Sequence, residues 1–421
     1  MSSAGWIMLI GALVGGSCAL LGCFLVLRKI SMLGDAISHA ILPGIVIAFL
    51  LTGSTSSFPI FVGAIVLGLL TAFLVQTLAR SGVQGDAAIG VTFTSLFAIG
   101  VVLVSQYAAQ KDLDLDCVLY GEIAFTPFDR VGGVPRAFWV NLALLAVNGI
   151  VLGLFYKQFK LCAFDPEMAS AVGISVAGFH YLLMALVSIT TVGAFESVGA
   201  ILVVAMLIVP AATAYLLTDR LEWMLAIAVA LGAAASAAGY FMARGLGCSI
   251  AGAMASVGGL FFATAFLFSP SHGVVTRRVA QGRMRRTVAD EDMLLWAGRR
   301  LEIEAEPAFD LRTVSRGIER LPRDTGAIVS RMLRAGLLTE VEGHYRLTER
   351  GEGRALELIR RHRVYESYLD ELGYPVDHLH AAADRVEHHL SPALTAAMDA
   401  AVAYPERDPQ GKPIPGSQDP R

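Results

Sequence analysis

Charged residues are scarce in this chain of 421 residues: they make up 16% of it, against about 25% in an average soluble protein. The scarcity is also uneven. Residues 1–270 hold 22 charged side chains, about 8% of the segment, whereas residues 271–421 hold 47, about 31%. A single soluble globular domain does not fit this distribution, and the chain is predicted to pass from lipid into water near residue 270. The net charge of −3 gives no argument for a polyanionic partner.

Two further absences limit the function. The five cysteines show no CxxC spacing, so neither a disulfide framework nor a thiolate zinc site is indicated. The chain has no GxxxxGKS or GxxxxGKT motif, which would form a loop that cradles the phosphates of ATP. We therefore expect that the chain is not an enzyme and binds no nucleotide. Any ATP hydrolysis that serves it must then be carried out by a separate protein.

Nine apolar runs are long enough to cross the roughly 30 Å of hydrocarbon in a bilayer. They predict an all-α polytopic membrane domain of about nine transmembrane helices within residues 1–270. Lys and Arg gather in alternate short loops and again after the ninth run, which places the polar C-terminal part in the cytoplasm. The predicted spans are 6–27, 33–52, 58–79, 87–107, 136–156, 174–192, 197–217, 222–243 and 247–268.

The polar third is predicted to be a small cytoplasmic domain. It starts with a basic juxtamembrane linker, residues 271–286, which carries five arginines and no acidic residue. Three helices and a hairpin with a Gly343-His344 turn follow within 287–348, an order typical of a winged-helix domain. Two more helices, at 349–371 and 377–390, lie within 349–405. The tail, 406–421, is rich in proline and is predicted to be irregular.

The most unusual feature of the membrane domain is an acid and an imidazole in an apolar run. Asp35 and His39 are four residues apart, so on a helix they share one face about one turn apart. Such groups are costly in lipid unless they pair or meet a cation or water, and together they suit a divalent metal such as Mn, Fe or Zn. The alternative is a mutually satisfied pair that only fixes packing. Pro43 is expected to interrupt the helix beside them.

A second segment, 164–174 (FDPEMASAVGI), lies on the predicted cytoplasmic side. Asp165 and Glu167 open a short helix, and Ala169 and Gly173 leave room for a partner to approach closely. The alternative is a capped helix that only connects two spans.

Four blocks in order give a specific resemblance. LRKISMLGDAISHAILPGI (27–45), DLDCVLYGEI (114–123), the segment 164–174 and SVGAILVVAMLIVPAATA (197–214) resemble the permease family of manganese, zinc and iron ABC transporters. The resemblance covers about residues 5–270. It implies a permease that dimerises, as a homo- or heterodimer, around a metal path to which Asp35 and His39 contribute. It also implies that 164–174 couples to a cytoplasmic ATPase, and that an extracytoplasmic metal-binding protein delivers the ion.

The C-terminal part has its own ligand pattern. Asp384, Glu387 and His388 fall at i, i+3 and i+4 of a predicted helix, and His362 on the preceding helix could complete a metal site. The alternative is a solvated charged helix. GHYRLTERGEGRALELIRRHRVYESYL followed by VEHHLSPAL resembles the diphtheria-toxin-repressor-like family of metal-dependent regulators over about 287–405.

That second resemblance implies that His362, Asp384, Glu387 and His388 are metal ligands and that 349–405 is a metal-binding and dimerisation domain. It also implies a ligand from the first helix, where Asp292 matches an acidic position. Leu295 stands where manganese sensors have a glutamate, so the alternatives are a site for one metal, a weak site and a vestigial one.

The function expected from both resemblances is an ATP-driven importer of a divalent metal, manganese first and then iron or zinc, in the bacterial cytoplasmic membrane. Its C-terminal domain is expected to sense cytoplasmic metal and slow uptake. The alternative is a membrane-tethered, metal-dependent DNA-binding regulator. Its candidate recognition helix, 324–335, offers Arg331 and Arg334 with Arg323 just before it, which is a small basic footprint for DNA.

Overall fold

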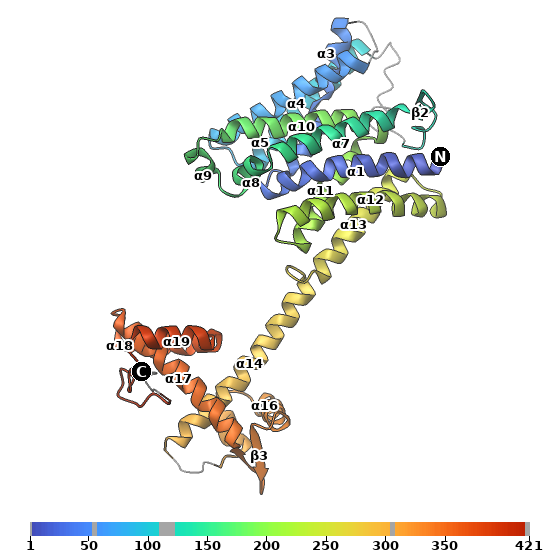
Figure 1. Cartoon of the computed structure of the whole chain (residues 1–421). Coiled ribbons are helices and arrows are strands. Elements are labelled where there is room, and N and C mark those ends of the chain that lie inside the picture. Colours follow the sequence, from blue (N-terminus) through green and yellow to red (C-terminus); the bar gives the residue numbers. More distant parts are fainter. Residues whose placement is uncertain (1, 53–56, 109–122, 304–307, 417–421) are drawn as a thin grey trace. The chain divides into compact units, whose positions relative to one another are not determined.

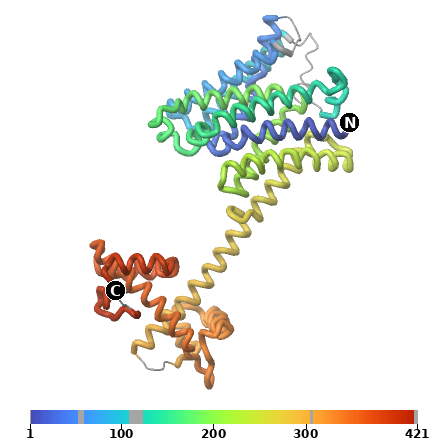
Figure 2. Tube along the Cα trace, in the orientation of Figure 1, coloured from blue at the N-terminus to red at the C-terminus, as the bar shows by residue number. Residues whose placement is uncertain are grey.

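The computed structural model describes residues 2–52, 57–108, 123–303 and 308–416, which form two compact units, Met1–Arg277 and Arg278–Arg421 (Figures 1 and 2). In the described parts of the first unit, nine helical segments are long and apolar enough to cross a membrane, with α2 and α3 counted together. They overlap the nine predicted spans, although the sixth runs on to Val198 instead of ending at residue 192, so the predicted fold class of the membrane domain is confirmed. The spanning helices are α1 (Ser3–Leu27), α2 (Met32–Ala40), α3 (Leu42–Thr52), α4 (Ser57–Arg80), α5 (Gly85–Leu103, extended by a π-helical turn Val104–Ala108), α7 (Arg136–Leu154), α10 (Val176–Val198), α11 (Ala200–Leu217), α12 (Leu221–Leu246) and α13 (Ile250–Phe268).

Helix α1 is the centre of the membrane unit, packed against α7, α11 and α12 (Figure 1). Small residues allow this packing: a Cβ atom on Gly15 would lie 3.0 Å from the backbone of Gly232 in α12. A polar contact adds to it, because the Asn148 amide of α7 donates to Ser17 Oγ of α1 and to Thr190 Oγ1 of α10, both at 2.8 Å. A buried amide in lipid needs such partners, so these bonds fix how α1, α7 and α10 lie against one another.

The second span is interrupted. Helix α2 ends at Ala40 and α3 begins at Leu42, with Ile41 between them. Pro43 lies in the first turn of α3, where the missing amide hydrogen has no helical partner to lose. This is the interruption expected from Pro43. It makes the segment that carries Asp35 and His39 a separate nine-residue helix.

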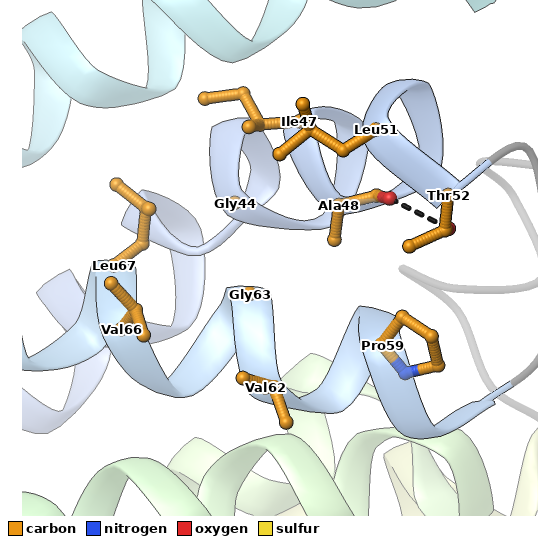
Figure 3. A pocket seen from close by; sticks show the side chains of 10 residues that line it. All are labelled: Gly44, Ile47, Ala48, Leu51, Thr52, Pro59, Val62, Gly63, Val66 and Leu67. Atoms are coloured by element: carbon orange, nitrogen blue, oxygen red, sulfur yellow. Dashed lines mark hydrogen bonds between the residues drawn. The ribbon is translucent and has the colours of Figure 1, made fainter.

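Helices α3 and α4 meet through two glycines. A Cβ atom on Gly44 would lie 2.4 Å from the carbonyl oxygen of Gly63, and one on Gly63 would lie 2.4 Å from that of Gly44. Beside this contact the two helices line a groove of about 420 Å³ (Figure 3). Its wall is apolar apart from Thr52, whose hydroxyl donates to the Ala48 carbonyl oxygen at 2.8 Å. Backbone contact, with no large side chain between, therefore sets the spacing of α3 and α4.

Short strands and helices lie between some of the spans. The strands β1 (Arg130–Val131) and β2 (Val134–Pro135) form a small antiparallel hairpin before α7. The helices α8 (Tyr156–Phe164) and α9 (Pro166–Ala171) connect α7 to α10. Most of the block 114–123 lies outside the described residues.

The second unit has the predicted order of helices and hairpin. Its elements are α14 (Val274–Leu301, which begins in the first unit), α15 (Leu311–Gly317), α16 (Pro322–Arg334), β3 (Leu338–Val341), β4 (His344–Leu347), α17 (Glu349–Glu371), α18 (Val376–Val386), a 3-10 turn (Glu387–His389) and α19 (Pro392–Ala401). Strands β3 and β4 pair antiparallel from Leu338↔Leu347 to Val341↔His344. Side chains from α14, α15, α16, β3 and α17 form one hydrophobic core. It includes Met293, Leu294, Val314, Ile328, Met332, Leu338 and Leu358.

Three boundaries in this unit differ from the sequence prediction. The segment predicted as a linker and the first helix form one continuous helix, α14, since 274–301 contains no proline to end it. The hairpin turn is Glu342-Gly343, both with positive φ (52° and 78°), one residue earlier than predicted. Helix α18 ends at Val386, so Glu387 and His388 lie in the 3-10 turn, off the helical face that they were expected to share with Asp384.

Candidate metal centres

Asp35 and His39 come together in the membrane unit. Oδ1 of Asp35 lies 3.6 Å from Nε2 of His39, and each side chain is 39% exposed. Both face a cavity of about 380 Å³ whose other wall is the apolar face of α11 from Ala200 to Val209. The imidazole also lies near the rings of Phe93 and Phe97 in α5, at 6.1 and 6.0 Å between centroids. Among the described residues that line this cavity, only Asp35 and His39 can bind a cation.

The segment 164–174, in the connection between α7 and α10, contains the short and mostly exposed helix α9. Asp165 caps α9 by accepting a hydrogen bond from the Met168 amide at 2.9 Å, and Glu167 is exposed in its first turn. Gly173, with a φ of +85°, directly follows the C-cap residue of α9. Ala169 is fully buried within the chain, so it is not available to a partner as the sequence suggested. The exposed apolar side chains are Phe164, Met168 and Val172, spaced by four residues.

Two neighbouring clusters form in the second unit, Arg278–Arg421. In the first, His362 of α17 lies between two acids: its Nδ1 is 2.6 Å from Glu387 Oε2, and its Nε2 is 3.1 Å from Glu366 Oε1. Asp384 Oδ1 lies 3.5 Å from His362 Nδ1. His380 of α18 lies on the other side, with its Nδ1 3.0 Å from Glu366 Oε1. Two sets of ligand atoms thus lie within 4.8 Å of one another: His362, Glu366 and His380, and His362, Asp384 and Glu387.

The second cluster is centred on His388. Its Nε2 lies 3.1 Å from Asp292 Oδ1 and 3.5 Å from Glu387 Oε1, and its Nδ1 lies 2.9 Å from Glu291 Oε2. Glu387 therefore contacts both imidazoles. All five residues predicted as ligands lie in these two clusters: Asp292, His362, Asp384, Glu387 and His388.

Carboxylates hold both imidazoles in the protonated form. Burial lowers the pKa of His362, but hydrogen bonds to Glu366 and Glu387 outweigh it and raise the pKa to about 9. Hydrogen bonds to Asp292 and Glu291 raise the pKa of His388 to about 10. A divalent cation could take the place of these two protons, because it binds the same nitrogen and oxygen atoms.

Three residues of the clusters were not among the predicted ligands: Glu291, Glu366 and His380. A signal for two of them is present in the sequence, because Glu366 follows His362 by four residues and His380 precedes Asp384 by four. Glu291 has no such signal. It lies 97 residues from its partner His388. The resemblance to metal-dependent regulators indicated a glutamate position at 295 and none at 291.

Comparisons with known proteins identify the family of each part of the chain. Residues 3–269 match the family described as the ABC 3 transport family. The chain belongs to the ABC 3 transport family. It is 53% identical to the manganese transport system membrane protein MntD of Bacillus subtilis over 68% of this chain and 99% of that protein. It is 42% identical to the zinc transport system membrane protein TroD of Treponema pallidum over 69% of this chain and 80% of that protein.

The membrane part also resembles a solved structure, and the C-terminal part matches a second family. PsaBC from Streptococcus pneumoniae, in complex with a Fab, is similar with a TM-score of 0.55 and 34% identity, over 65% of this chain and 94% of that chain. Residues 348–416 match the metal-binding and dimerisation domain of iron-dependent repressors. The chain is thus the multi-pass permease of a manganese, zinc or iron ABC importer, joined to a repressor-like domain. ABC 3 permeases lack an ATPase site and act with an ATPase and a substrate-binding protein.

The residues of the repressor-like domain fit a divalent metal. The side chains of His362, Glu366 and Glu387 are 5%, 1% and 3% exposed, so their charged groups are held out of water around a small shared volume. The donors are imidazole nitrogens and carboxylate oxygens without a thiolate, a set that suits manganese, iron or zinc. An ion in the first cluster would link α17 to α18, and an ion in the second would link the 3-10 turn to α14 through Asp292.

The arginines of the candidate recognition helix have partners inside the repressor-like unit. Arg331 of α16 forms a two-pronged ion pair with Asp290 of α14, with its Nη2 2.5 Å from Oδ1. Arg334 donates from Nε to the carbonyl oxygen of Ser330 at 3.2 Å. Arg331 would have to leave Asp290 to reach a phosphate, which weakens the case for DNA binding.

Proposed function

We propose that this chain is the permease of an ATP-driven manganese importer in the bacterial cytoplasmic membrane and that its cytoplasmic repressor-like domain slows uptake when it binds the same metal. Iron and zinc are the next candidates for the transported ion. The observation that carries the regulatory half is the pair of clusters whose central imidazoles are buried and joined by Glu387, since they lie on the same chain as the transport path.

Asp35 and His39 are proposed to hold the ion transiently in the membrane. They are a carboxylate and an imidazole 3.6 Å apart, and both line an otherwise apolar cavity. One hard and one borderline donor bind a divalent ion without a full cage, which suits a site that must release its ion. Replacing Asp35 and His39 with alanine is expected to abolish manganese uptake while leaving ATPase association intact. Glu196→Gln, which changes a carboxylate paired with Arg136, is the control and should transport normally.

The partners proposed are a second permease subunit, a cytoplasmic ATPase and an extracytoplasmic metal-binding protein. The exposed side chains of Phe164, Met168 and Val172 give the ATPase an apolar contact on α9 and its flanks. The proposal requires α9 and the repressor-like domain to lie on the cytoplasmic side, which is the side that the loop charges predict for both.

The regulatory half is tested in proteoliposomes that contain the permease with its ATPase. ATP and buffered Mn²⁺ are on the cytoplasmic side, and the metal-binding protein with the Mn²⁺ to be transported is on the other side. Uptake by the wild type is expected to fall as cytoplasmic Mn²⁺ rises. Asp384→Ala/His388→Ala should keep a high rate under the same conditions. The matched control is Asp377→Ala/His378→Ala, an exposed acid and imidazole at the start of α18, which should respond like the wild type.

Equal inhibition of wild type and Asp384→Ala/His388→Ala would disprove regulation through these clusters. Retention of a specific duplex DNA by the full chain, at physiological salt and only with Mn²⁺, would instead support the membrane-tethered regulator.

A further inference from the structure

The C-terminal tail reaches the first metal cluster. Residues 405–416 contain no helix and no strand, yet they are fixed to the repressor-like unit: Asp408 and Ile414 are buried, and Arg407 bridges to Pro413. At the tip of the loop between them, Gln410 donates from Nε2 to Glu366 Oε1 at 3.3 Å. The same oxygen lies 3.1 Å from His362 Nε2 and 3.0 Å from His380 Nδ1. Three side chains from three segments thus converge on a single carboxylate oxygen.

The loop that presents Gln410 has a defined shape. Oδ1 of Asp408 accepts hydrogen bonds from the backbone amides of Gln410 and Lys412, at 3.0 and 2.8 Å. The Asp408 amide in turn donates to the Lys412 carbonyl oxygen at 2.9 Å. An acid that caps a tight loop in this way orders its backbone. Gln410 is therefore held at its tip and is not on a freely moving end.

Two arginines of α17 fasten this loop beside the cluster. Arg363 donates from Nη1 to the Pro413 carbonyl oxygen at 2.5 Å, and its Nε lies 3.3 Å from Asp408 Oδ2. Arg360 donates to the Pro415 carbonyl oxygen at 2.8 Å. Between the tail and α17 remains a cavity of about 130 Å³, whose polar wall includes His362, Glu366, His380 and Gln410. The space is large enough for an ion and a few waters.

We propose that Gln410 is a metal ligand and that the tail, residues 405–416, is a strap that closes on the ion held by His362, Glu366 and His380. A cation at this position would repel the amide nitrogen and attract the amide oxygen, so the Gln410 side chain turns its Oε1 toward the ion. Two imidazole nitrogens, a carboxylate oxygen and an amide oxygen then surround the metal. The proposal rests on the proposed metal binding by the repressor-like domain and adds to it a tail segment that the ion holds more tightly in place.

The experiment uses the full chain in lipid nanodiscs, stripped of metal and titrated with Mn²⁺ alone. Two quantities are measured: the affinity for Mn²⁺, from the electron paramagnetic resonance signal of the free ion, and hydrogen exchange in a peptide that covers 405–416. In the wild type, Mn²⁺ is expected to slow exchange in the tail. In Gln410→Ala this slowing should be lost, and the affinity of the cluster should fall by at least about tenfold.

Two variants separate the ligand role from a change in the loop. Gln410→Glu keeps an oxygen donor and should retain both the affinity and the slowed exchange. Lys412→Ala changes another residue of the same loop that lines the same cavity. Because it removes a positive charge, it should bind Mn²⁺ at least as tightly as the wild type and keep the slowed exchange. If Gln410→Ala binds Mn²⁺ and protects the tail as Lys412→Ala does, the strap is disproved.

His380→Ala distinguishes failure of the strap from failure of the metal cluster. Weaker Mn²⁺ binding in His380→Ala, together with wild-type behaviour of Gln410→Ala, would leave the cluster in place and overturn only the strap. Wild-type affinity in His380→Ala would overturn both the strap and the proposed metal binding at His362, Glu366 and His380.

Discussion

Nδ1 of His362 lies 2.6 Å from Oε2 of Glu387, at the contact between α17 and the 3-10 turn that follows α18. The other oxygen of the same carboxylate lies 3.5 Å from Nε2 of His388. One buried side chain therefore contacts the central imidazoles of both clusters. Its replacement should affect both, which a change in either histidine alone would not do.

Glu387→Gln is expected to weaken Mn²⁺ binding by at least about tenfold, because the amide keeps the shape of the side chain but removes its charge. Isothermal titration of the full chain with Mn²⁺ measures the change. Asp377→Asn, an exposed acid on α18, should leave the affinity unchanged. Equal affinities in the two variants would remove Glu387 from the metal site.

Metal binding is expected to strengthen as pH rises. With pKa values of about 9 and about 10, His362 and His388 are protonated near neutral pH, and Mn²⁺ must displace those protons. Each proton released makes the affinity rise up to about tenfold per pH unit below the pKa of the histidine concerned. Glu291→Gln removes a carboxylate that raises the pKa of His388, so its affinity should depend less steeply on pH. An affinity independent of pH between 6.5 and 9 would contradict this account.

Protonation of His362 and His388 also stabilises the metal-free domain, so the stability of that domain should depend on pH. A histidine whose pKa is raised above its usual value of 6.5 contributes its full stability below that pH and loses it as pH passes the raised value. The metal-free repressor-like domain should therefore become less stable between about pH 7 and 10. Hydrogen exchange in α17, corrected for the intrinsic pH dependence of exchange, would report it. Saturating Mn²⁺ should remove the loss.

Gly44→Ala should destabilise the membrane unit. The added Cβ would lie 2.4 Å from the Gly63 carbonyl oxygen, so α3 and α4 must separate, at a cost of roughly 1–3 kcal/mol. Since α3 follows directly on the helix that carries Asp35 and His39, uptake should fall as well. Gly149→Ala, in a spanning helix where an added Cβ meets no atom within 4 Å, is the control. Thermal unfolding in detergent compares the two, and equal midpoints would refute the packing argument.

Met168→Asp should weaken binding of the ATPase to the permease. The substitution puts a charge between the exposed apolar side chains of Phe164 and Val172. The measurement is the amount of ATPase that co-purifies with the permease. Val131→Asp, an exposed apolar residue of the hairpin before α7, should retain the ATPase fully. Undiminished co-purification with Met168→Asp would assign α9 a purely connecting role.

The spans and the winged-helix order could be read from sequence because each depends on local pattern. Hydropathy locates a span whatever its neighbours are, and Pro43 interrupts a helix for reasons confined to its own turn. The metal centres depend on contacts between distant segments. Spacing placed Asp35 beside His39, and it could have indicated Glu366 and His380. It could not indicate Gln410 or Glu291, whose partners lie 44 and 97 residues away.

The position of Glu387 between His362 and His388 has a consequence for the dose response of the transporter. When an ion in the first cluster orders the Glu387 carboxylate, the other oxygen of that carboxylate is already positioned to bind an ion in the second cluster. Metal binding in the first cluster therefore favours metal binding in the second. Inhibition of uptake would then set in over a narrow range of cytoplasmic manganese, with a Hill coefficient above one. A cell with such a permease would keep importing until a threshold and then stop within minutes, without waiting for new protein to be made.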